Sequence, residues 1–369
     1  MSPPEPLPPG ATIGILGGGQ LGRMLAMAAA RLGMRCHVLC PDAGSPAFDV
    51  AAERTVAAYD DPTALDAFAR AVDVATYEFE NVPVAAVERL AAIVPVRPGA
   101  RALAVGQDRL TEKQFLQARG IGVADFAAVA SAAELRHAVE HVGLPAIVKT
   151  RRYGYDGKGQ ARIAAIADID AAFAALAGEP VLVEAFVPFS REVSVIAVRG
   201  ADGATASYDP AENDHSGGIL RSSRVPARLR PETAAKAAET ARAMLAALDY
   251  VGVIGVEFFV VEEAGEDRLL VNEFAPRVHN SGHWTEDGCA VSQFESHIRA
   301  VAGWPLGPTD RHADVIMTNL IGDDVDEWRR LAADPQARLH LYGKREARPG
   351  RKMGHVNQLR PLEKGAGSF

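Results

Sequence analysis

The chain has 369 residues, of which 48% are hydrophobic and 23% are charged, and its formal net charge is −8. This length and composition indicate a globular protein with more than one lobe. The acidic balance excludes a general attraction to nucleic acid or to an anionic membrane, so we expect no nucleic-acid partner. The longest apolar runs are shorter than the ~20 residues that a membrane-spanning helix needs, so we expect no membrane partner either.

The first ten residues, MSPPEPLPPG, are rich in proline and contain neither a basic nor an apolar segment. We therefore expect residues 1–10 to be a disordered leader and not a signal peptide. The three cysteines, Cys36, Cys40 and Cys289, are too few and odd in number for a disulfide framework. This count favours a reducing compartment, and we expect the protein to be cytoplasmic.

Residues 11–105 alternate between short apolar runs and helical patterns. The run ATIGIL, a glycine turn, an Ala/Leu/Met-rich helix and a second apolar run predict a βαβ unit at the start of a doubly wound, Rossmann-like lobe. Gly17, Gly19 and Gly22 form G-x-G-x-x-G in the first turn, and Asp42 ends the second strand. This motif suits a dinucleotide, but it equally suits another anion at a helix N-terminus, or a tight turn with no ligand.

The segment KTRRYGYDGKGQ, residues 149–160, follows the apolar run LPAIV. Its glycines permit positive φ angles and close approach of the backbone to a ligand. Lys149, Arg151 and Arg152 lie together without acids between them, and like charges repel each other unless an anion shares them. The segment lacks the Ser or Thr that a P-loop places after its lysine. We expect a mobile glycine-rich flap over phosphates, with a solvated turn as the alternative.

Two apolar runs, VIGVEFFVVE and RLLVNEFAPR, flank EAGED and predict a β-hairpin. If the hairpin is symmetric about Gly265, Glu257 and Glu273 lie opposite each other on one face. Directly opposed carboxylates destabilise a strand pair, and a hard cation with oxygen ligands removes that penalty. Glu257 and Glu273 are therefore predicted Mg²⁺ ligands, and two exposed glutamates on an open strand face are the alternative.

The stretch HNSGHWTEDG follows this hairpin and contains His279 and His283. Its Asn, Ser and Gly content predicts a loop, so we do not expect the two histidines to bind zinc from one helix face. Arg277 and His279 would instead face the space that the metal and the flap enclose, unless the loop is only a polar cap for the backbone.

The basic stretch 344–352 predicts either a solvated face or a site for a phosphate monoester. Pro349 and Gly350 stand between Lys344 and Arg351, so a turn could bring these two cations to one point.

Together, a strand lysine, a glycine-rich flap and two metal-type glutamates resemble the ATP-grasp fold. Within it, the chain resembles the 5-(carboxyamino)imidazole ribonucleotide synthase family in the strings GGGQLGRML, YEFENVP, DRLTEKQFL, GYDGKGQ, NEFAPRVHNSGHWT and RPGRKMGHVN. The resemblance implies an α/β fold with an N-terminal Rossmann-like lobe over residues 11–105 and an ATP-grasp domain over 106–303. It also implies a flap subdomain at about residues 115–186 and a small C-terminal lobe over 304–369.

The resemblance implies a ligase of purine biosynthesis that uses ATP, Mg²⁺, bicarbonate and 5-aminoimidazole ribonucleotide, and it implies a homodimer. ATP would phosphorylate bicarbonate to carboxyphosphate. The exocyclic amine would capture this intermediate, or CO₂ released from it, to give 5-carboxyaminoimidazole ribonucleotide, ADP and phosphate. Carboxyphosphate is lost to water, so the reaction needs a lid.

The resemblance also assigns roles to individual residues. The residues implied in ATP binding are Arg109, Lys149, Gly154, Tyr155, Asp156, Gly157, Lys158, Gly159, Gln160, Glu184, Ala185, Phe186, Val187, Glu192, His215, Asn272 and Glu273. The residues implied in binding the aminoimidazole ribonucleotide are Gln20, Glu78, Tyr155, Lys344 and Arg351, the last two through its phosphate. The residues implied in catalysis are Asp156, Lys158, Arg277 and His279, and Glu257 and Glu273 would hold Mg²⁺. The general base for the amine stays open between Asp156 and the phosphate released in the site.

Three other functions compete with this one. A neighbouring ATP-grasp carboxylate–amine ligase of purine biosynthesis would act on a different ribonucleotide or carboxylate. An NAD-dependent oxidoreductase would use the G-x-G-x-x-G turn, and a regulatory nucleotide-binding module would bind without turnover. Release of phosphate from ATP without a change in NADH absorbance would exclude the oxidoreductase, and any turnover would exclude the module.

Overall fold

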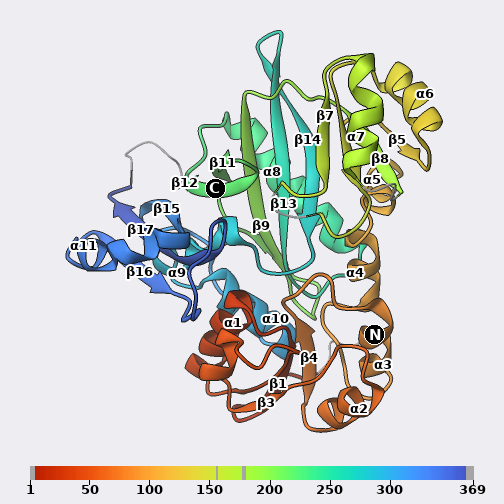
Figure 1. Ribbon diagram of the computed structural model, residues 1–369. Coiled ribbons are helices and arrows are strands. Elements are labelled where there is room, and N and C mark those ends of the chain that lie inside the picture. Colours follow the sequence, from red (N-terminus) through yellow and green to blue (C-terminus); the bar gives the residue numbers. More distant parts are fainter. Residues whose placement is uncertain (1–4, 155–156, 177–179, 363–369) are drawn as a thin grey trace.

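The computed structural model describes residues 5–154, 157–176 and 180–362, which form three β-sheets with helices packed against them (Figure 1). Part of the expected disordered leader is ordered: the Leu7 amide donates to the Ala302 carbonyl at 2.9 Å, and the Leu7 carbonyl accepts from Trp304 Nε1 at 2.7 Å. The expectation of disorder is therefore wrong for Leu7, because backbone hydrogen bonds hold it; residues 1–4 lie outside the described part.

The N-terminal lobe is built on a four-stranded parallel sheet in the order β3-β2-β1-β4. β1 lies inside this sheet with most of its residues buried, as expected for a continuous apolar run. The strands are β1 (Thr12–Leu16), β2 (Arg35–Leu39), β3 (Glu53–Thr55) and β4 (Val74–Tyr77). The helices are α1 (Gln20–Arg31), α2 (Pro62–Arg70), α3 (Val84–Ala91) and α4 (Ala100–Gly106). The predicted βαβ unit is confirmed.

A second, antiparallel sheet in the order β5-β8-β6-β7 forms the flap subdomain at the upper right of Figure 1. The strands are β5 (Phe126–Val129), β6 (Ala146–Thr150), β7 (Gln160–Ile163) and β8 (Val181–Ala185). The helices α6 (Ala132–Val142) and α7 (Ile169–Ala175) pack against it and complete a separate hydrophobic core. The predicted flap connects β6 and β7.

The largest sheet has nine strands in the order β14-β13-β9-β11-β12-β15-β17-β16, with β10 paired to β9. Its strands are β9 (Arg191–Arg199), β10 (Thr205–Ser207), β11 (Ala211–Ser216), β12 (Ile219–Val225), β13 (Gly252–Glu263), β14 (Glu266–Ala275), β15 (Asp314–Ile321), β16 (Ala337–Leu341) and β17 (Lys352–Arg360). The helices associated with it are α5 (Arg109–Gln117), α8 (Pro231–Ala247), α9 (Thr285–Gly288), α10 (Gln293–Ala302) and α11 (Trp328–Ala332). The C-terminal strands β15, β16 and β17 therefore extend the largest sheet instead of forming a sheet of their own.

One hydrophobic core joins the N-terminal lobe to the large sheet. Helix α1 packs against α10, and buried residues from both helices belong to the same cluster. His297 on α10 adds a polar link: its Nδ1 accepts from the Val253 amide at 3.1 Å, so its Nε2–H donates to Thr76 Oγ1 at 2.8 Å. Within the described residues, no helix combines the length and the apolar character needed to span a bilayer.

Replacing Ile298 with alanine should lower the free energy of unfolding by about 2–5 kcal/mol, because it leaves a cavity in a core. Ile298 is 0% exposed in the cluster that both lobes share, so the two lobes should lose structure in one transition. Urea titration followed by circular dichroism and by tryptophan fluorescence measures this. Ile93→Ala is the control, since Ile93 is 40% exposed. Two separate transitions would contradict the shared core.

Candidate active site

The site is organised around Glu257 and Glu273, which pair directly across β13 and β14, as predicted. The hairpin turns at Ala264 and Gly265, whose φ angles are 51° and 85°, and this turn alone would place Glu257 opposite Asn272. A bulge next to Glu257 shifts the register by one residue and brings Glu273 opposite it. The opposition of the two carboxylates therefore depends on the bulge as well as on the turn.

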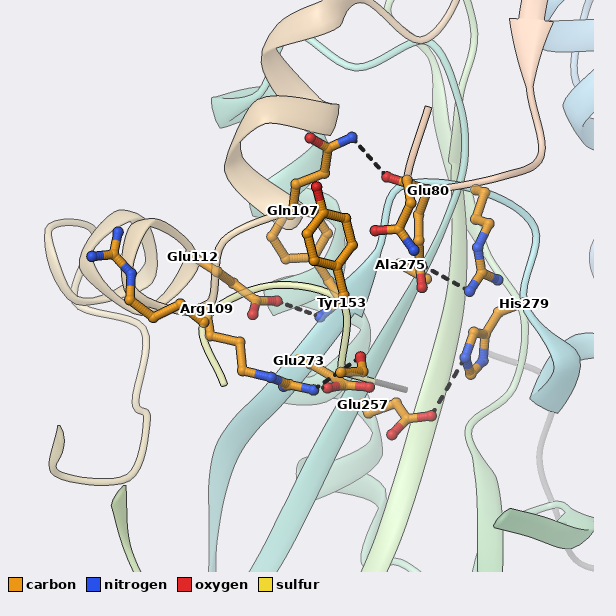
Figure 2. A pocket seen from close by; sticks show the side chains of 15 residues that line it. Glu80, Gln107, Arg109, Glu112, Tyr153, Glu257, Glu273, Ala275 and His279 are labelled. Carbon is orange, nitrogen blue, oxygen red and sulfur yellow. Dashed lines mark hydrogen bonds and ion pairs between the residues drawn. The ribbon is translucent and has the colours of Figure 1, made fainter. Parts of the chain in front are cut away.

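The two carboxylates differ in charge environment. Burial and the neighbouring Glu273 raise the pKa of Glu257. Burial also opposes ionisation of Glu273, but Arg109 Nη1 lies 2.7 Å from its Oε2, and this ion pair lowers the pKa of Glu273 (Figure 2). The adjacent Asn272 Oδ1 is buried without a hydrogen-bond partner. Two carboxylates and an orphaned amide oxygen are ligands of the kind that Mg²⁺ prefers, so this residue set fits the predicted cation.

Two cationic side chains of helix α5, Arg109 and Lys113, extend toward the site from one face of the helix. Arg109 and Lys113 are four residues apart and so share a face. Lys113 Nζ donates to the Asn272 carbonyl at 2.8 Å and lies 3.4 Å from Glu184 Oε1, while Lys149 Nζ lies 2.7 Å from Glu184 Oε2. Although burial acts in the opposite direction, the two lysines lower the pKa of Glu184 to about 2. Sequence analysis missed Lys113, although its helical spacing from Arg109 is visible in DRLTEKQFL.

Glu112, on the same helix, lines the pocket and was also missed. Its Oε1 accepts from the Phe274 amide at 2.7 Å, and burial raises the pKa of its carboxyl to about 8 (Figure 2). Its hydrogen bond fixes the backbone of β14 next to Glu273.

The glycine-rich flap connects β6 and β7. A Cβ on Gly159 would lie 2.4 Å from Thr150 Oγ1, and the φ of Gly159 is 71°, so glycine is required there. A Cβ on Gly157 would lie 3.0 Å from the Gly217 carbonyl, which places the flap against the turn between β11 and β12. The Gly154 carbonyl accepts from Arg109 Nη2 at 3.4 Å.

Two further flap residues that were predicted to bind ATP, Lys158 and Gln160, are exposed. Tyr155 and Asp156, predicted in ATP and substrate binding and in catalysis, lie outside the described residues.

No acids stand between the cations near the flap in the sequence, but acids from distant parts of the chain pair with two of them, so a bound anion is not needed to offset their repulsion. Arg151 forms a two-pronged pair with Asp108, its closest contact being 2.7 Å, and Asp108 also caps the N-terminus of α5. Arg152 donates to Gln107 Oε1 at 2.8 Å, and Lys149 pairs with Glu184. The ion pair between Arg151 and Asp108 thus connects the base of the flap to the start of α5.

The residues predicted to bind adenosine lie in and just after β8 and on β9 and β11. Ala185 ends β8, Phe186 is half-exposed, and Val187 is buried against residues of β13 and β14. His215 Nδ1 lies 3.3 Å from Glu192 Oε2. Burial lowers the pKa of His215, but the carboxylates of Glu192 and Glu257 together outweigh burial and raise it. Contact of these residues with adenosine stays a prediction.

In the N-terminal lobe, a carboxylate fills the glycine turn. Glu78 Oε1 accepts from the Gly19 amide at 2.7 Å, and a Cβ on Gly17 would lie 2.6 Å from the Glu78 side chain. Burial raises the pKa of Glu78, and the positive charges of Arg277 and Lys344 partly offset this rise. A carboxylate at this position competes with an anion for the helix N-terminus, which disfavours the pyrophosphate of NAD. Gln20 begins α1 beside this turn.

Arg277 and His279 enter the site after β14, as predicted. Arg277 Nη2 lies 2.8 Å from Glu80 Oε2, so the guanidinium bridges the central hairpin and the N-terminal lobe. His279 Nε2 lies 3.5 Å from Glu257 Oε1 (Figure 2). Burial, together with the charges of Arg277 and Lys352, lowers the pKa of His279 to about 3, so the ring is neutral. Both side chains line the pocket that contains the two glutamates.

The structure places the two cations of the basic stretch in different surroundings. Lys344 lies near Glu78, and its charge partly offsets the rise in the pKa of that carboxyl. Its Nζ also donates to the Lys352 carbonyl at 2.6 Å. Arg351 donates to the Glu346 carbonyl at 2.9 Å. Their convergence on one phosphate stays a prediction.

A second group of possible metal ligands consists of Glu286, His340 and His355 in the C-terminal part of the sheet. The two imidazole rings stack 4.4 Å apart with an interplanar angle of 5°. Nitrogen lone pairs lie in the plane of each ring, and the lone pairs of stacked parallel rings do not converge on one ion. His340 Nε2 is instead 2.7 Å from Asp287 Oδ2, so His340 pairs with a carboxylate outside this group.

Comparison with known proteins identifies the domains in the same order. Residues 10–107 match the ribonucleotide synthetase preATP-grasp domain, residues 114–294 the ATP-grasp domain, and residues 315–364 the phosphoribosylaminoimidazole carboxylase C-terminal domain. The predicted ATP-grasp fold with a Rossmann-like N-terminal lobe is confirmed. The division at residues 105/106 and 303/304 stays a prediction.

The relatives cover nearly the whole chain. The N5-carboxyaminoimidazole ribonucleotide synthase of Brucella melitensis is 56% identical over 357 residues, covering 96% of this chain and 98% of that protein. A crystal structure of an ADP complex of N5-carboxyaminoimidazole ribonucleotide synthetase has a TM-score of 0.93 and 41% identity, covering 97% of this chain and 94% of that chain. The Aspergillus clavatus N5-carboxyaminoimidazole synthase, in complex with ADP and 5-aminoimidazole ribonucleotide, has a TM-score of 0.90 and 35% identity, covering 96% and 95% of the two chains. This chain therefore belongs to the N5-carboxyaminoimidazole ribonucleotide synthase family of ATP-grasp ligases.

Proposed function

We propose that this protein is an ATP-dependent ligase of purine biosynthesis that carboxylates the exocyclic amine of 5-aminoimidazole ribonucleotide and uses bicarbonate as the carbon source. The products are N5-carboxyaminoimidazole ribonucleotide, ADP and phosphate. The observation that carries the proposal is the pocket in which the opposed Glu257 and Glu273 meet Arg109, Arg277 and His279. A related enzyme of the same fold binds ADP and 5-aminoimidazole ribonucleotide together.

In the first step, a bicarbonate oxygen attacks the γ-phosphorus of ATP, a P–O bond forms, and ADP leaves. Lys149 and the flap amides would hold the phosphates, and Arg109 would turn from Glu273 toward them. Glu257, Glu273 and Asn272 would hold Mg²⁺, which when bound screens charge on the phosphoryl oxygens. Arg277 and His279 would orient bicarbonate.

In the second step, the exocyclic amine attacks the carboxyl carbon of carboxyphosphate, or CO₂ released from it, and phosphate leaves. The amine must lose a proton, which goes either to Asp156 or to the departing phosphate. Glu78 and Gln20 would hold the ribonucleotide on the side of the N-terminal lobe, and Lys344 and Arg351 would hold its phosphate. The flap would exclude water, which otherwise hydrolyses carboxyphosphate.

We further propose a homodimer in the cytoplasm. The three cysteines are free and buried, which is compatible with a reducing compartment.

Phosphate release from MgATP, with each co-substrate omitted in turn, tests the function directly. The full rate should require both bicarbonate and 5-aminoimidazole ribonucleotide. Full phosphate release with another ribonucleotide in its place would redirect the proposal to a neighbouring ligase.

Glu257→Gln and Glu273→Gln should each nearly abolish turnover, because each removes a charge that opposes the cation. The fold should survive, since removing one of two opposed carboxylates relieves their repulsion. Phosphate release and circular dichroism measure the two effects. Glu263→Gln, on the exposed end of the same hairpin, is the matched control and should retain activity. An active double variant would end the metal assignment.

Arg351→Ala should weaken binding of the ribonucleotide by roughly 1.5–3 kcal/mol, the usual value of a hydrogen bond to a charged group. This corresponds to about one to two decades in apparent affinity. Steady-state kinetics with each substrate varied separately should show a higher Michaelis constant for the ribonucleotide and an unchanged one for ATP.

Arg348→Ala is the control for the basic stretch, because Arg348 is exposed and pairs with Glu346 on the surface. If Arg351→Ala raises the Michaelis constant for ATP alone, the stretch is misassigned. If it changes neither constant, the stretch is a solvated face.

A further inference from the structure

Two features fix the position of His279 independently of the contacts of its ring: hydrogen bonds to its backbone and a close fit around its Cβ. Gln293 clamps its backbone: Oε1 accepts from the His279 amide at 2.9 Å, and Nε2 donates to the His279 carbonyl at 2.7 Å. Gly255, on the strand that carries Glu257, leaves the space that its side chain occupies, because a Cβ there would lie 2.5 Å from His279 Cβ. The imidazole therefore enters the site at a fixed position.

A chain of two serine hydroxyls reaches the inner nitrogen of this ring. Ser194 Oγ donates to Ser281 Oγ at 2.7 Å, and Ser281 Oγ lies 2.9 Å from His279 Nδ1. The Ser281 amide also donates to His279 Nδ1, at 3.4 Å. Ser194 and Ser281 are 1% and 0% exposed, so water does not replace either hydroxyl.

These hydrogen bonds determine where the ring proton sits. A serine hydroxyl has one proton, and because Ser281 Oγ already accepts from Ser194, its own proton is directed to His279 Nδ1. The Ser281 amide can only donate, so it also requires Nδ1 to be an acceptor. The opposite tautomer, with a proton on Nδ1, would oppose that amide and leave the buried Ser281 proton without an acceptor among its described partners, at a cost in free energy.

We infer that Ser281, supported by Ser194, is a positioning residue that fixes His279 as the Nε2–H tautomer. The Nε2–H group is the one that points toward Glu257 (Figure 2). His279 is then a hydrogen-bond donor to an oxygen of the anionic reactant and does not remove the proton from the amine. This role for Ser281 rests on the proposed function, whereas the tautomer itself does not.

The tautomer can be read directly from the ring nitrogens of the full chain labelled with ¹⁵N-histidine. His279→Asn identifies the His279 signals by their absence. In the wild type we expect a pyridine-type Nδ1 and a pyrrole-type Nε2 for His279. Ser281→Ala should move both signals toward the opposite tautomer, and it should lower kcat by about 5- to 10-fold, the effect of one hydrogen bond, with the Michaelis constant for ATP unchanged.

Two variants separate positioning from packing. Ser194→Ala keeps the Ser281 hydroxyl, so it should move the tautomer signals and kcat in the same direction but less. Ser296→Ala is the matched control, because Ser296 is 0% exposed and shares a hydroxyl pair with Tyr208 Oη at 2.8 Å. It should leave the His279 signals and kcat unchanged even if stability falls.

A protonated Nδ1 in the wild type, or a wild-type tautomer in Ser281→Ala, would overturn the inference. If Ser281→Ala fails to fold, the wild-type and Ser194→Ala spectra decide. If the wild type has the expected tautomer but does not release phosphate with the proposed substrates, the proposed function fails and the serine chain stands.

Discussion

The structure depends on one unfavourable contact, the direct opposition of Glu257 and Glu273 on the central hairpin. Two like charges on facing strands are stable only where neighbouring groups compensate for them. Arg109 provides one such compensation from α5, whereas burial and the neighbouring Glu273 raise the pKa of Glu257. Arg109, Arg277 and the neutral imidazole of His279 line the same pocket as this pair.

The hydrophobic cores show which parts of the chain are packed together around this centre. The N-terminal lobe shares a core with α10 and the large sheet, so the ribonucleotide side of the site is joined to the strand pair that carries the glutamates. The flap subdomain has a separate core between its own sheet and helices. Ion pairs such as Arg151 with Asp108 connect it to the rest, and such contacts exchange partners more readily than packed side chains do.

Sequence patterns sufficed for the βαβ unit and the flap strands, because alternation and glycine turns are local signals. The opposition of Glu257 and Glu273 was predicted correctly, but from a symmetry about Gly265 that the turn itself does not have. The bulge next to Glu257, which leaves Asn272 without a partner on β13, was not predictable from the sequence. The pairing of Glu257 with Glu273 nevertheless depends on it. The acids that pair with Lys149 and Arg151 were also missed, since Glu184 and Asp108 lie about 35 and 43 residues away along the chain. Long-range partners of this kind leave no periodic signal. The tautomer inferred for His279 likewise involves Ser194, which lies on β9.

The glycine turn of the N-terminal lobe has lost its usual charge preference. In other βαβ proteins the bare amides at this helix start attract phosphate. Here the chain supplies its own anion, Glu78, and the glycines make the room for it. A molecule that approaches this turn meets a carboxylate instead of a positive dipole, so it gains most by offering hydroxyl or amino hydrogens. This backbone shape, which binds anions when its amides are bare, is therefore suited here to ligands that donate hydrogen bonds.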